Sequence, residues 1–184
     1  MFSIGLNNYD GHSVVVFPPV KSQEDFNRVM AMSGFSCSLA VPEVIAAMEA
    51  NPSMFPRESV EAVKVIEAGK PVIFAEASIV KEMDKSLVKA MIDHEVGHIV
   101  NDHFNQSDED YNFNGVSVSD RKEIEADAYS ASINGASVVW CAIKEVVNCY
   151  DKIAISMGMV PNEDNLEKIM IHPSNIARKQ ALGM

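Results

Sequence analysis

The stretch MIDHEVGHIV, residues 91–100, constrains the fold of this chain more than any other, because it carries two of the five histidines, four positions apart. On an α-helix, residues four apart lie on one face with their Cβ atoms about 6 Å apart. His94 and His98 can therefore meet one tetrahedral metal ion at about 2.0–2.1 Å. Gly97 costs about 1 kcal/mol in a helix interior, which predicts that another element packs closely against this helix.

A glutamate between the two histidines, Glu95, completes the pattern His-Glu-x-x-His. It lies about 100° around the helix from His94, so its carboxylate is poorly aimed at the metal ion itself. It can still reach a water molecule bound to that ion, where hydrolysis needs a general base. The bare pattern also arises by chance. A third ligand, and residues that orient the two imidazoles, must therefore be present elsewhere in the chain.

The segment SDRKEIEADAYSA supplies a candidate third ligand. Glu123 and Asp127 are four apart and share one face of the predicted helix, whereas Glu125 points about 200° away from Glu123. The alternative is an acidic face in contact with solvent, but apolar residues of the same helix lie near the Glu123/Asp127 row. We predict that Glu123 closes the metal site and that Asp127 hydrogen-bonds the distal nitrogen of a ligating histidine.

The order HEVGH and then EIEAD resembles the gluzincin metallopeptidases, and is most similar to the family of CAAX prenyl proteases and HtpX, whose second motif is Glu-x-x-Ala-Asp. The resemblance implies that Glu123 is a zinc ligand and aligns Asp127 with the aspartate of that motif. Near the C-terminus, HPSNIAR resembles the segment that closes the family's catalytic domain. It implies that His172 and Arg178 lie near the catalytic cleft, where a donor stabilises a tetrahedral oxyanion. The alternative is that His172 marks a helix boundary and that Arg178 is a surface or salt-bridged residue.

The resemblance covers roughly residues 70–184. The best-known members of the family carry transmembrane helices, whereas this chain has no run of about eighteen apolar residues, so it is more similar to the small soluble members called minigluzincins. Metzincins need a third histidine six residues after the second, and His103 falls five residues after His98. His103 is instead expected to end the helix, where a histidine meets the last carbonyl groups favourably. Proteases of the ImmA/IrrE type usually have asparagine at the position of Asp127, which makes them the second choice.

Charge and cysteine content limit the partners and the compartment. The chain has 26 acidic and 15 basic residues and a net charge of −11. That excess repels phosphate backbones and anionic lipid, so neither nucleic acid nor a membrane is expected as a partner. The three cysteines are widely spaced and form no C-x-x-C pair, which suits a reducing compartment. The N-terminal residues lack the features of a signal peptide, and a cytoplasmic location is predicted.

The expected fold is α+β: a mostly helical, zincin-like metallopeptidase domain with a small β-sheet on its N-terminal side and an active-site helix. We treat residues 1–184 as a single domain, in which 70–184 form the zinc-binding catalytic part and 1–69 have no assigned role. The strand at 71–80 is either buried and structural or an edge strand that pairs with extended substrate. Strands are expected at 2–6, 13–17 and 71–80, and helices at 22–34, 41–51, 55–69, 84–103, 120–134 and 137–158, with a last pair around IHPSN.

Together these features predict a zinc-dependent metalloendopeptidase that acts on a peptide or protein substrate. Zn²⁺ held by His94, His98 and Glu123 keeps its fourth position for water, and Glu95 takes the proton of that water as it attacks a peptide carbonyl. The alternative, from another class, is a non-catalytic zincin-fold subunit of a larger assembly, in which a fourth protein ligand caps the metal. Three residues are candidate caps: His103, Asp127 and His172.

Overall fold

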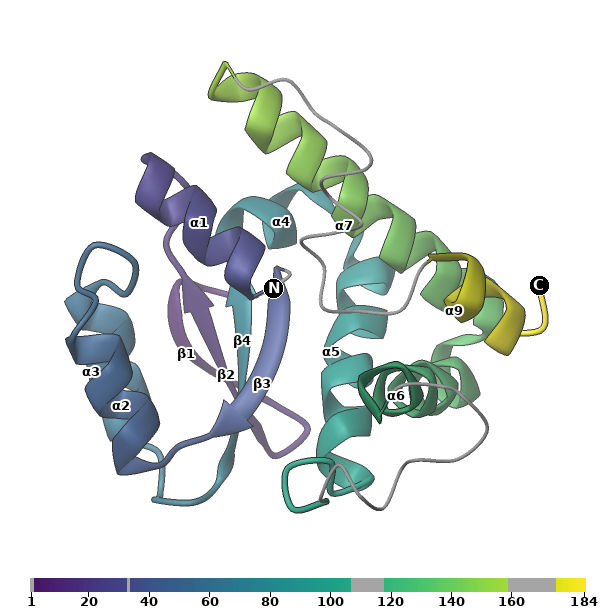
Figure 1. Cartoon of the computed structure of the whole chain (residues 1–184), viewed down its shortest axis with the longest axis horizontal. Coiled ribbons are helices and arrows are strands. Elements are labelled where there is room, and N and C mark those ends of the chain that lie inside the picture. Colours follow the sequence, from purple (N-terminus) through teal and green to yellow (C-terminus); the bar gives the residue numbers. More distant parts are fainter. Residues whose placement is uncertain (1, 33, 107–117, 159–174) are drawn as a thin grey trace.

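The structure, a computed structural model, describes residues 2–32, 34–106, 118–158 and 175–184. A four-stranded sheet is covered by helices on both faces, and the longest helices follow it in the chain (Figure 1). The predicted α+β class, with a small sheet on the N-terminal side and a mostly helical remainder, is thus confirmed. Among the described residues, no helix combines the length and the apolar character needed to cross a membrane.

The sheet contains β1 (Gly5–Tyr9), β2 (His12–Phe17), β3 (Phe35–Leu39) and β4 (Pro71–Glu76), in the spatial order β1-β2-β4-β3. β1 and β2 form an antiparallel hairpin, β2 runs parallel to β4, and β3 runs antiparallel to β4. β4 is therefore an interior strand and β3 lies at an edge. Of the two alternatives for residues 71–80, the structure shows the buried one.

Helices form a layer on each face of the sheet. α2 and α3 cover one face and α5 covers the other, while α6 and α7 pack against α5 (Figure 1). The bounds are α1 Gln23–Ala31, α2 Pro42–Glu49, α3 Arg57–Lys64, α4 Ala77–Glu82, α5 Lys85–Val100, α6 Val118–Asn134, α7 Ala136–Ser156 and α9 Asn175–Ala181.

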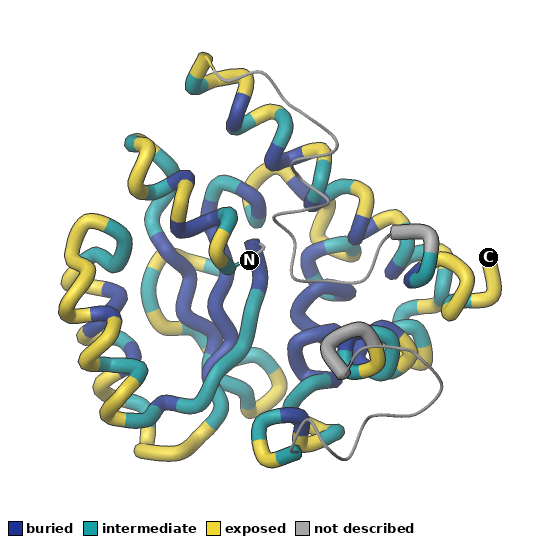
Figure 2. The backbone as a smooth tube through the Cα atoms, viewed as in Figure 1, coloured by how far each residue is buried: buried dark blue, intermediate teal, exposed yellow. Residues whose placement is uncertain are grey.

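The two faces of β2 belong to two separate hydrophobic clusters. Val14 and Val16 face the cluster shared with α5 and α7, whereas Val15 and Phe17 face the cluster shared with α2 and α3. Successive side chains of a strand point to opposite faces, and a sheet covered on both sides needs apolar residues at every position. This explains the unbroken VVVF run, which is buried throughout (Figure 2).

α5 and α6 approach each other closely at Gly97. A Cβ atom at this position would lie 2.9 Å from Ala126 Cα and 3.0 Å from Ala126 O. The predicted close packing at Gly97 is therefore present, and its partner is the second motif. One turn further along α6 and two turns back along α5, the Ser130 hydroxyl donates a hydrogen bond to the Ala90 carbonyl at 2.7 Å. The contact fixes the two motif-bearing helices face to face.

Several boundaries differ from the prediction. The first strand begins at Gly5 rather than residue 2, and the helix predicted at 55–69 ends at Lys64. The strand predicted at 71–80 ends at Glu76, whose carboxylate binds Arg28, and α4 then begins. β3 was not predicted, although FSCSL alternates apolar and polar residues: the run is only five residues long, includes two serines, and forms through pairing with β4.

The predicted helix pair around IHPSN is described in part. α9, which carries Arg178, is the second member of that pair. His172 and the residues of the first member lie outside the described residues.

Candidate metal centre

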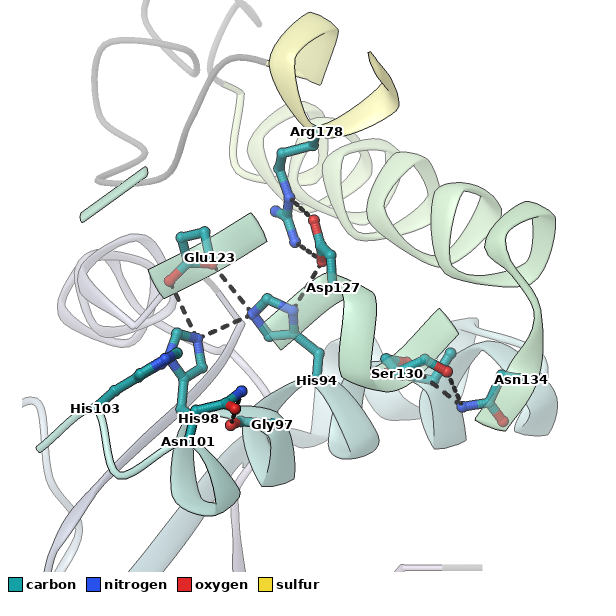
Figure 3. Close-up of polar contacts among 11 residues, drawn as sticks. His94, Gly97, His98, Asn101, His103, Glu123, Asp127, Ser130, Asn134 and Arg178 are labelled. Atoms are coloured by element: carbon teal, nitrogen blue, oxygen red, sulfur yellow. Dashed lines mark hydrogen bonds and ion pairs between the residues drawn. The ribbon is translucent and has the colours of Figure 1, made fainter. Parts of the chain in front are cut away.

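The three predicted ligands come together between α5 and α6. The Nε2 atoms of His94 and His98 lie 3.2 Å apart, and the Glu123 carboxylate oxygens lie 3.1 Å from His94 Nε2 and 3.2 Å from His98 Nε2 (Figure 3). All three residues are largely buried, and their donor atoms lie within 4.8 Å of one another. The group can hold a metal ion.

The donor set fits a small tetrahedral ion. Bonds of about 2.0–2.1 Å at tetrahedral angles separate ligand atoms by about 3.3 Å, close to the distances observed here. The local field also favours a cation. Burial lowers the pKa of His94, but the neighbouring carboxylates of Asp127 and Glu123 outweigh burial and raise that pKa to about 10.

Asp127 and Arg178 stand behind His94. His94 Nδ1 lies 2.8 Å from Asp127 Oδ1, and Arg178 donates to both oxygens of Asp127, from Nε at 2.7 Å and from Nη2 at 2.6 Å (Figure 3). Burial raises the pKa of Asp127, but the hydrogen bonds from Arg178 and His94 outweigh it and lower that pKa to about 2. Asp127 is therefore an anion and accepts the His94 Nδ1–H, so Nε2 is the nitrogen on which a metal ion can take the place of the second proton.

Arg178 is a salt-bridged residue, which was one of the alternatives considered for it from the sequence. Two of its nitrogens bind Asp127, and its side chain is almost fully buried against α6. The catalytic role implied for it by the resemblance stays a prediction, and so does that of His172, which lies outside the described residues.

His98 has an outer partner that the sequence did not suggest. Its Nδ1 atom lies 2.9 Å from His103 Nδ1, and His103 Nε2 lies 3.2 Å from Glu125 Oε2. Burial lowers the pKa of His103 below its usual range, although the hydrogen bond that its ring donates to Glu125 opposes this shift. Glu125 in turn accepts a 2.9 Å hydrogen bond from Arg121. The His103 ring was expected to meet the last carbonyl groups of the helix, but it contacts His98 and Glu125 instead, and only its backbone N–H donates to a carbonyl of α5, that of His98.

A local signal for His103 exists in the way α5 ends. Asp102 has a positive φ of 54°, and the N–H groups of Asp102 and His103 donate to the carbonyls of Ile99 and His98. This pair of bonds defines a Schellman motif, usually marked by glycine at the left-handed position. Aspartate takes that position here, so the sequence does not indicate the motif. It therefore does not indicate either that the chain turns back and places residue 103 over residue 98.

Glu95, the predicted general base, is also buried, with an exposed fraction of 4%. It lies beside Cys37 of the edge strand β3: burial and then the charge of Glu95 raise the pKa of the Cys37 thiol well above its usual range. Glu95 does not belong to the donor group found among the described residues. It stands on the same helix as His94 and His98, about 100° around from His94, on the side toward β3.

Two of the three candidate caps are engaged elsewhere. Asp127 binds His94 Nδ1 and Arg178, and the His103 ring lies on the far side of His98 from the donor group. His172 falls outside the described residues. Within the part of the chain that the structure describes, the centre has three protein ligands.

Asp93, next to His94 in the chain, anchors a separate polar cluster. The Tyr9 hydroxyl donates to Asp93 Oδ1 at 2.8 Å, while Lys89 Nζ and Asn134 Nδ2 donate to Oδ2 at 2.6 and 2.7 Å. Burial, together with the hydrogen bond and charge of Asp93, raises the pKa of Tyr9 to about 12. The cluster ties β1 and the end of α6 to α5 and thereby fixes the helix that carries the ligands.

Comparisons with protein families, with curated proteins and with solved structures give no match to this chain. The resemblance to gluzincins therefore rests on the motif residues and on their arrangement, and it enters the functional conclusion as a proposal.

Proposed function

We propose that the protein is a zinc-dependent metalloendopeptidase of the gluzincin type. The observation that carries the proposal is the convergence of two imidazole nitrogens and one carboxylate from α5 and α6, at separations that suit a tetrahedral ion. Two nitrogens and one oxygen favour zinc over calcium or magnesium, which take mainly oxygen ligands. Two histidines, one glutamate and an open position are typical of catalytic rather than structural zinc.

The chain's own residues have distinct tasks in this hydrolysis. Zn²⁺ bound at the centre supplies Lewis acidity and lowers the pKa of water to about 7. Glu95 takes the proton of the attacking water and delivers it to the leaving amine, as a general base and then a general acid. Asp127 holds His94 in the tautomer whose Nε2 is unprotonated. The ionised Arg178 keeps Asp127 anionic in this buried position.

The edge strand β3 supports a peptide as the substrate. Among the described residues, β3 pairs with β4 alone and lies at the border of the sheet. Its central residue, Cys37, lies beside Glu95, so a peptide added to this edge runs past the general base. An extended peptide gains backbone hydrogen bonds by adding a strand to an exposed edge. The substrate-pairing role considered for residues 71–80 therefore passes to β3, because β4 is interior.

Glu95→Gln tests the proposal most directly. The variant should bind zinc as the wild type does and lose peptide cleavage by about 10²- to 10⁴-fold, because a general base contributes that much. Metal content of the purified protein and cleavage of a peptide library are the two measurements. Glu43→Gln, at an exposed position of α2, is the matched control and should change neither.

Each contrary outcome has a distinct meaning. Retained cleavage, or loss of zinc from Glu95→Gln, excludes the assigned role of Glu95. Stoichiometric zinc in a wild-type protein that cleaves no peptide favours the alternative of a non-catalytic zincin-fold subunit. A wild-type protein that neither contains nor binds a divalent metal contradicts the whole proposal.

A further inference from the structure

The two ligating imidazoles are supported from behind in different ways. His94 Nδ1 faces the carboxylate of Asp127, which can only accept a hydrogen bond while ionised. His98 Nδ1 faces another imidazole, that of His103, at 2.9 Å. A neutral imidazole has one donor nitrogen and one acceptor nitrogen, so contact with His103 alone does not determine which of the two rings carries the shared proton.

Glu125 removes that ambiguity. Its Oε2 atom lies 3.2 Å from His103 Nε2, and a carboxylate only accepts, so the His103 proton sits on Nε2. His103 Nδ1 then has a free lone pair and accepts the Nδ1–H of His98. His98 Nε2 is left unprotonated toward Glu123 and His94, which is the form that binds a metal ion.

We propose that His103 is a positioning residue of the metal centre, which together with Glu125 fixes the tautomer and ring orientation of the ligand His98. The inference rests on the proposed metal binding and adds to it a pair of residues that the motifs do not contain. On this proposal His98 is oriented through a chain of three groups, His98–His103–Glu125. His94, in contrast, is oriented by the Asp127 carboxylate directly.

Backbone hydrogen bonds hold the His98–His103–Glu125 chain in place. The Schellman motif at the end of α5 returns His103 over His98, with the rings edge to face and their centroids 5.0 Å apart. The His103 carbonyl accepts a 3.0 Å hydrogen bond from Lys122 Nζ of α6. The His103 side chain is only 3% exposed. A polar ring so deeply buried, with both nitrogens engaged and its backbone held on two sides, is already in its working position.

The decisive measurement is the Zn²⁺ dissociation constant, determined by competition with a chelator. His103→Ala removes the acceptor and should weaken Zn²⁺ binding by about 10- to 100-fold, the usual effect of losing an outer partner. His103→Asn places an amide oxygen near the former Nδ1 position and should recover most of the affinity. A residue that only filled space would show no such rescue. His12→Ala, a histidine of the hairpin strand β2 outside the centre, is the matched control and should bind Zn²⁺ as the wild type does.

Glu125 gives a second pair of variants that does not empty a buried position, because its side chain is 34% exposed. Glu125→Gln keeps an acceptor for His103 and should leave Zn²⁺ affinity near that of the wild type. Glu125→Ala removes the acceptor and should lower the affinity. Circular dichroism of the metal-free variants shows whether the fold is retained, and if His103→Ala does not fold, the Glu125 pair and His103→Asn decide.

Proton NMR of the Co²⁺-substituted protein observes the hydrogen bond itself. Each ligating imidazole should give one exchangeable, hyperfine-shifted Nδ1–H signal. In His103→Ala, the His98 signal should be lost to fast exchange with water, while the His94 signal, protected by Asp127, should persist.

Unchanged Zn²⁺ affinity in both alanine variants, or two protected signals in His103→Ala, would overturn the proposal for His103. A wild type that binds Zn²⁺ without cleaving peptides refutes the peptidase function alone, because the affinity comparison still decides the role of His103. A wild-type protein that binds neither Zn²⁺ nor Co²⁺ contradicts both the peptidase function and the role of His103.

Discussion

Two arginines in this protein are buried and grip a carboxylate with two nitrogens each. Arg28 of α1 donates to Glu76 at the end of β4, from Nε at 2.7 Å and from Nη2 at 3.1 Å. Arg178 of α9 donates to Asp127 of α6 at 2.7 and 2.6 Å. The pair chemistry is the same in the two regions, yet only one of them lies at the candidate metal centre.

The difference lies in what each pair contacts next. Arg28 directs its further hydrogen bonds to Asp25 and to the backbone carbonyls of Pro18 and Met54. These contacts join α1, the end of the sheet and the loop before α3. The Asp127 carboxylate, besides its two hydrogen bonds from Arg178, contacts the imidazole of His94. A buried ion pair is thus no sign of a functional site by itself. The contact with His94 distinguishes the Arg178–Asp127 pair from the Arg28–Glu76 pair.

The largest expected effect is on the pair without an imidazole. Arg28→Ala leaves the Glu76 carboxylate buried and unpaired by Arg28, so the free energy of unfolding should fall by about 3–5 kcal/mol. Urea denaturation of the metal-free protein measures this loss. The Zn²⁺ affinity of the folded fraction should not change, because Arg28 does not contact the centre. Arg57→Ala, at an exposed arginine, is the control, and equal stability of the two variants would contradict the prediction.

The pair at the centre should respond in two quantities. Asp127→Asn keeps the shape of the side chain but leaves the Arg178 charge uncompensated, and the free energy of unfolding should fall by about 3 kcal/mol. Zn²⁺ affinity should also fall by about 10- to 100-fold, since His94 loses its anionic acceptor. Asp84→Asn, at an exposed N-terminal position of α5 without a capping hydrogen bond, is the control. A loss of stability with unchanged Zn²⁺ affinity would make Asp127 a structural residue of the same kind as Glu76.

A smaller effect is expected where the two motif helices meet. In Gly97→Ala the new Cβ meets Ala126 backbone atoms at 2.9 and 3.0 Å, so α5 and α6 must move apart. Overpacking of this kind costs about 1–3 kcal/mol, whereas the helix propensity of alanine acts in the opposite direction by about 1 kcal/mol. Denaturation should show a net loss of stability together with weaker Zn²⁺ binding. A more stable variant with unchanged affinity would mean that the helices accommodate the methyl group.

The parts of the centre that the sequence predicted are those encoded at helical spacing. The four-residue intervals from His94 to His98 and from Glu123 to Asp127 place side chains on one helix face, and the structure brings these four residues together. Gly97 predicted a close neighbour because glycine is otherwise unfavourable in a helix. Each of these inferences needs only the geometry of a single helix.

The parts that were missed depend on contacts between distant segments. β3 forms by pairing with β4, some 35 residues later, and the alternation of apolar and polar residues in FSCSL is too short to require a strand by itself. The partners of Arg28 and Arg178 lie 48 and 51 residues away along the chain. His103 was expected to end the helix, whereas α5 ends at Val100. The contact of its ring with His98 requires a left-handed aspartate at residue 102, a conformation that sequence patterns seldom indicate for residues other than glycine.

The smallest expected effect on stability comes from the partly exposed hydrogen bond between Tyr9 and Asp93. Its loss can be compared with the losses expected for the two buried ion pairs. Tyr9→Phe removes one of the three donors to Asp93 and should cost about 1 kcal/mol at neutral pH. The pKa of Tyr9 is raised from 10.0 to about 12 in the folded protein. The tyrosine therefore adds stability that is fully present below pH 10 and is lost as the pH rises toward 12.

Urea denaturation across that range should thus show the wild type losing its advantage over Tyr9→Phe. Tyr129→Phe, in α6 and outside the Asp93 cluster, is the control for the loss of a tyrosine hydroxyl. Zn²⁺ affinity should change little in either variant, since Lys89 and Asn134 still hold Asp93. A pH-independent difference for Tyr9→Phe would mean that the Asp93 carboxylate does not hold the Tyr9 proton. A large loss of Zn²⁺ affinity in Tyr9→Phe would instead mean that the Asp93 cluster, like the Asp127–Arg178 pair, supports the metal centre.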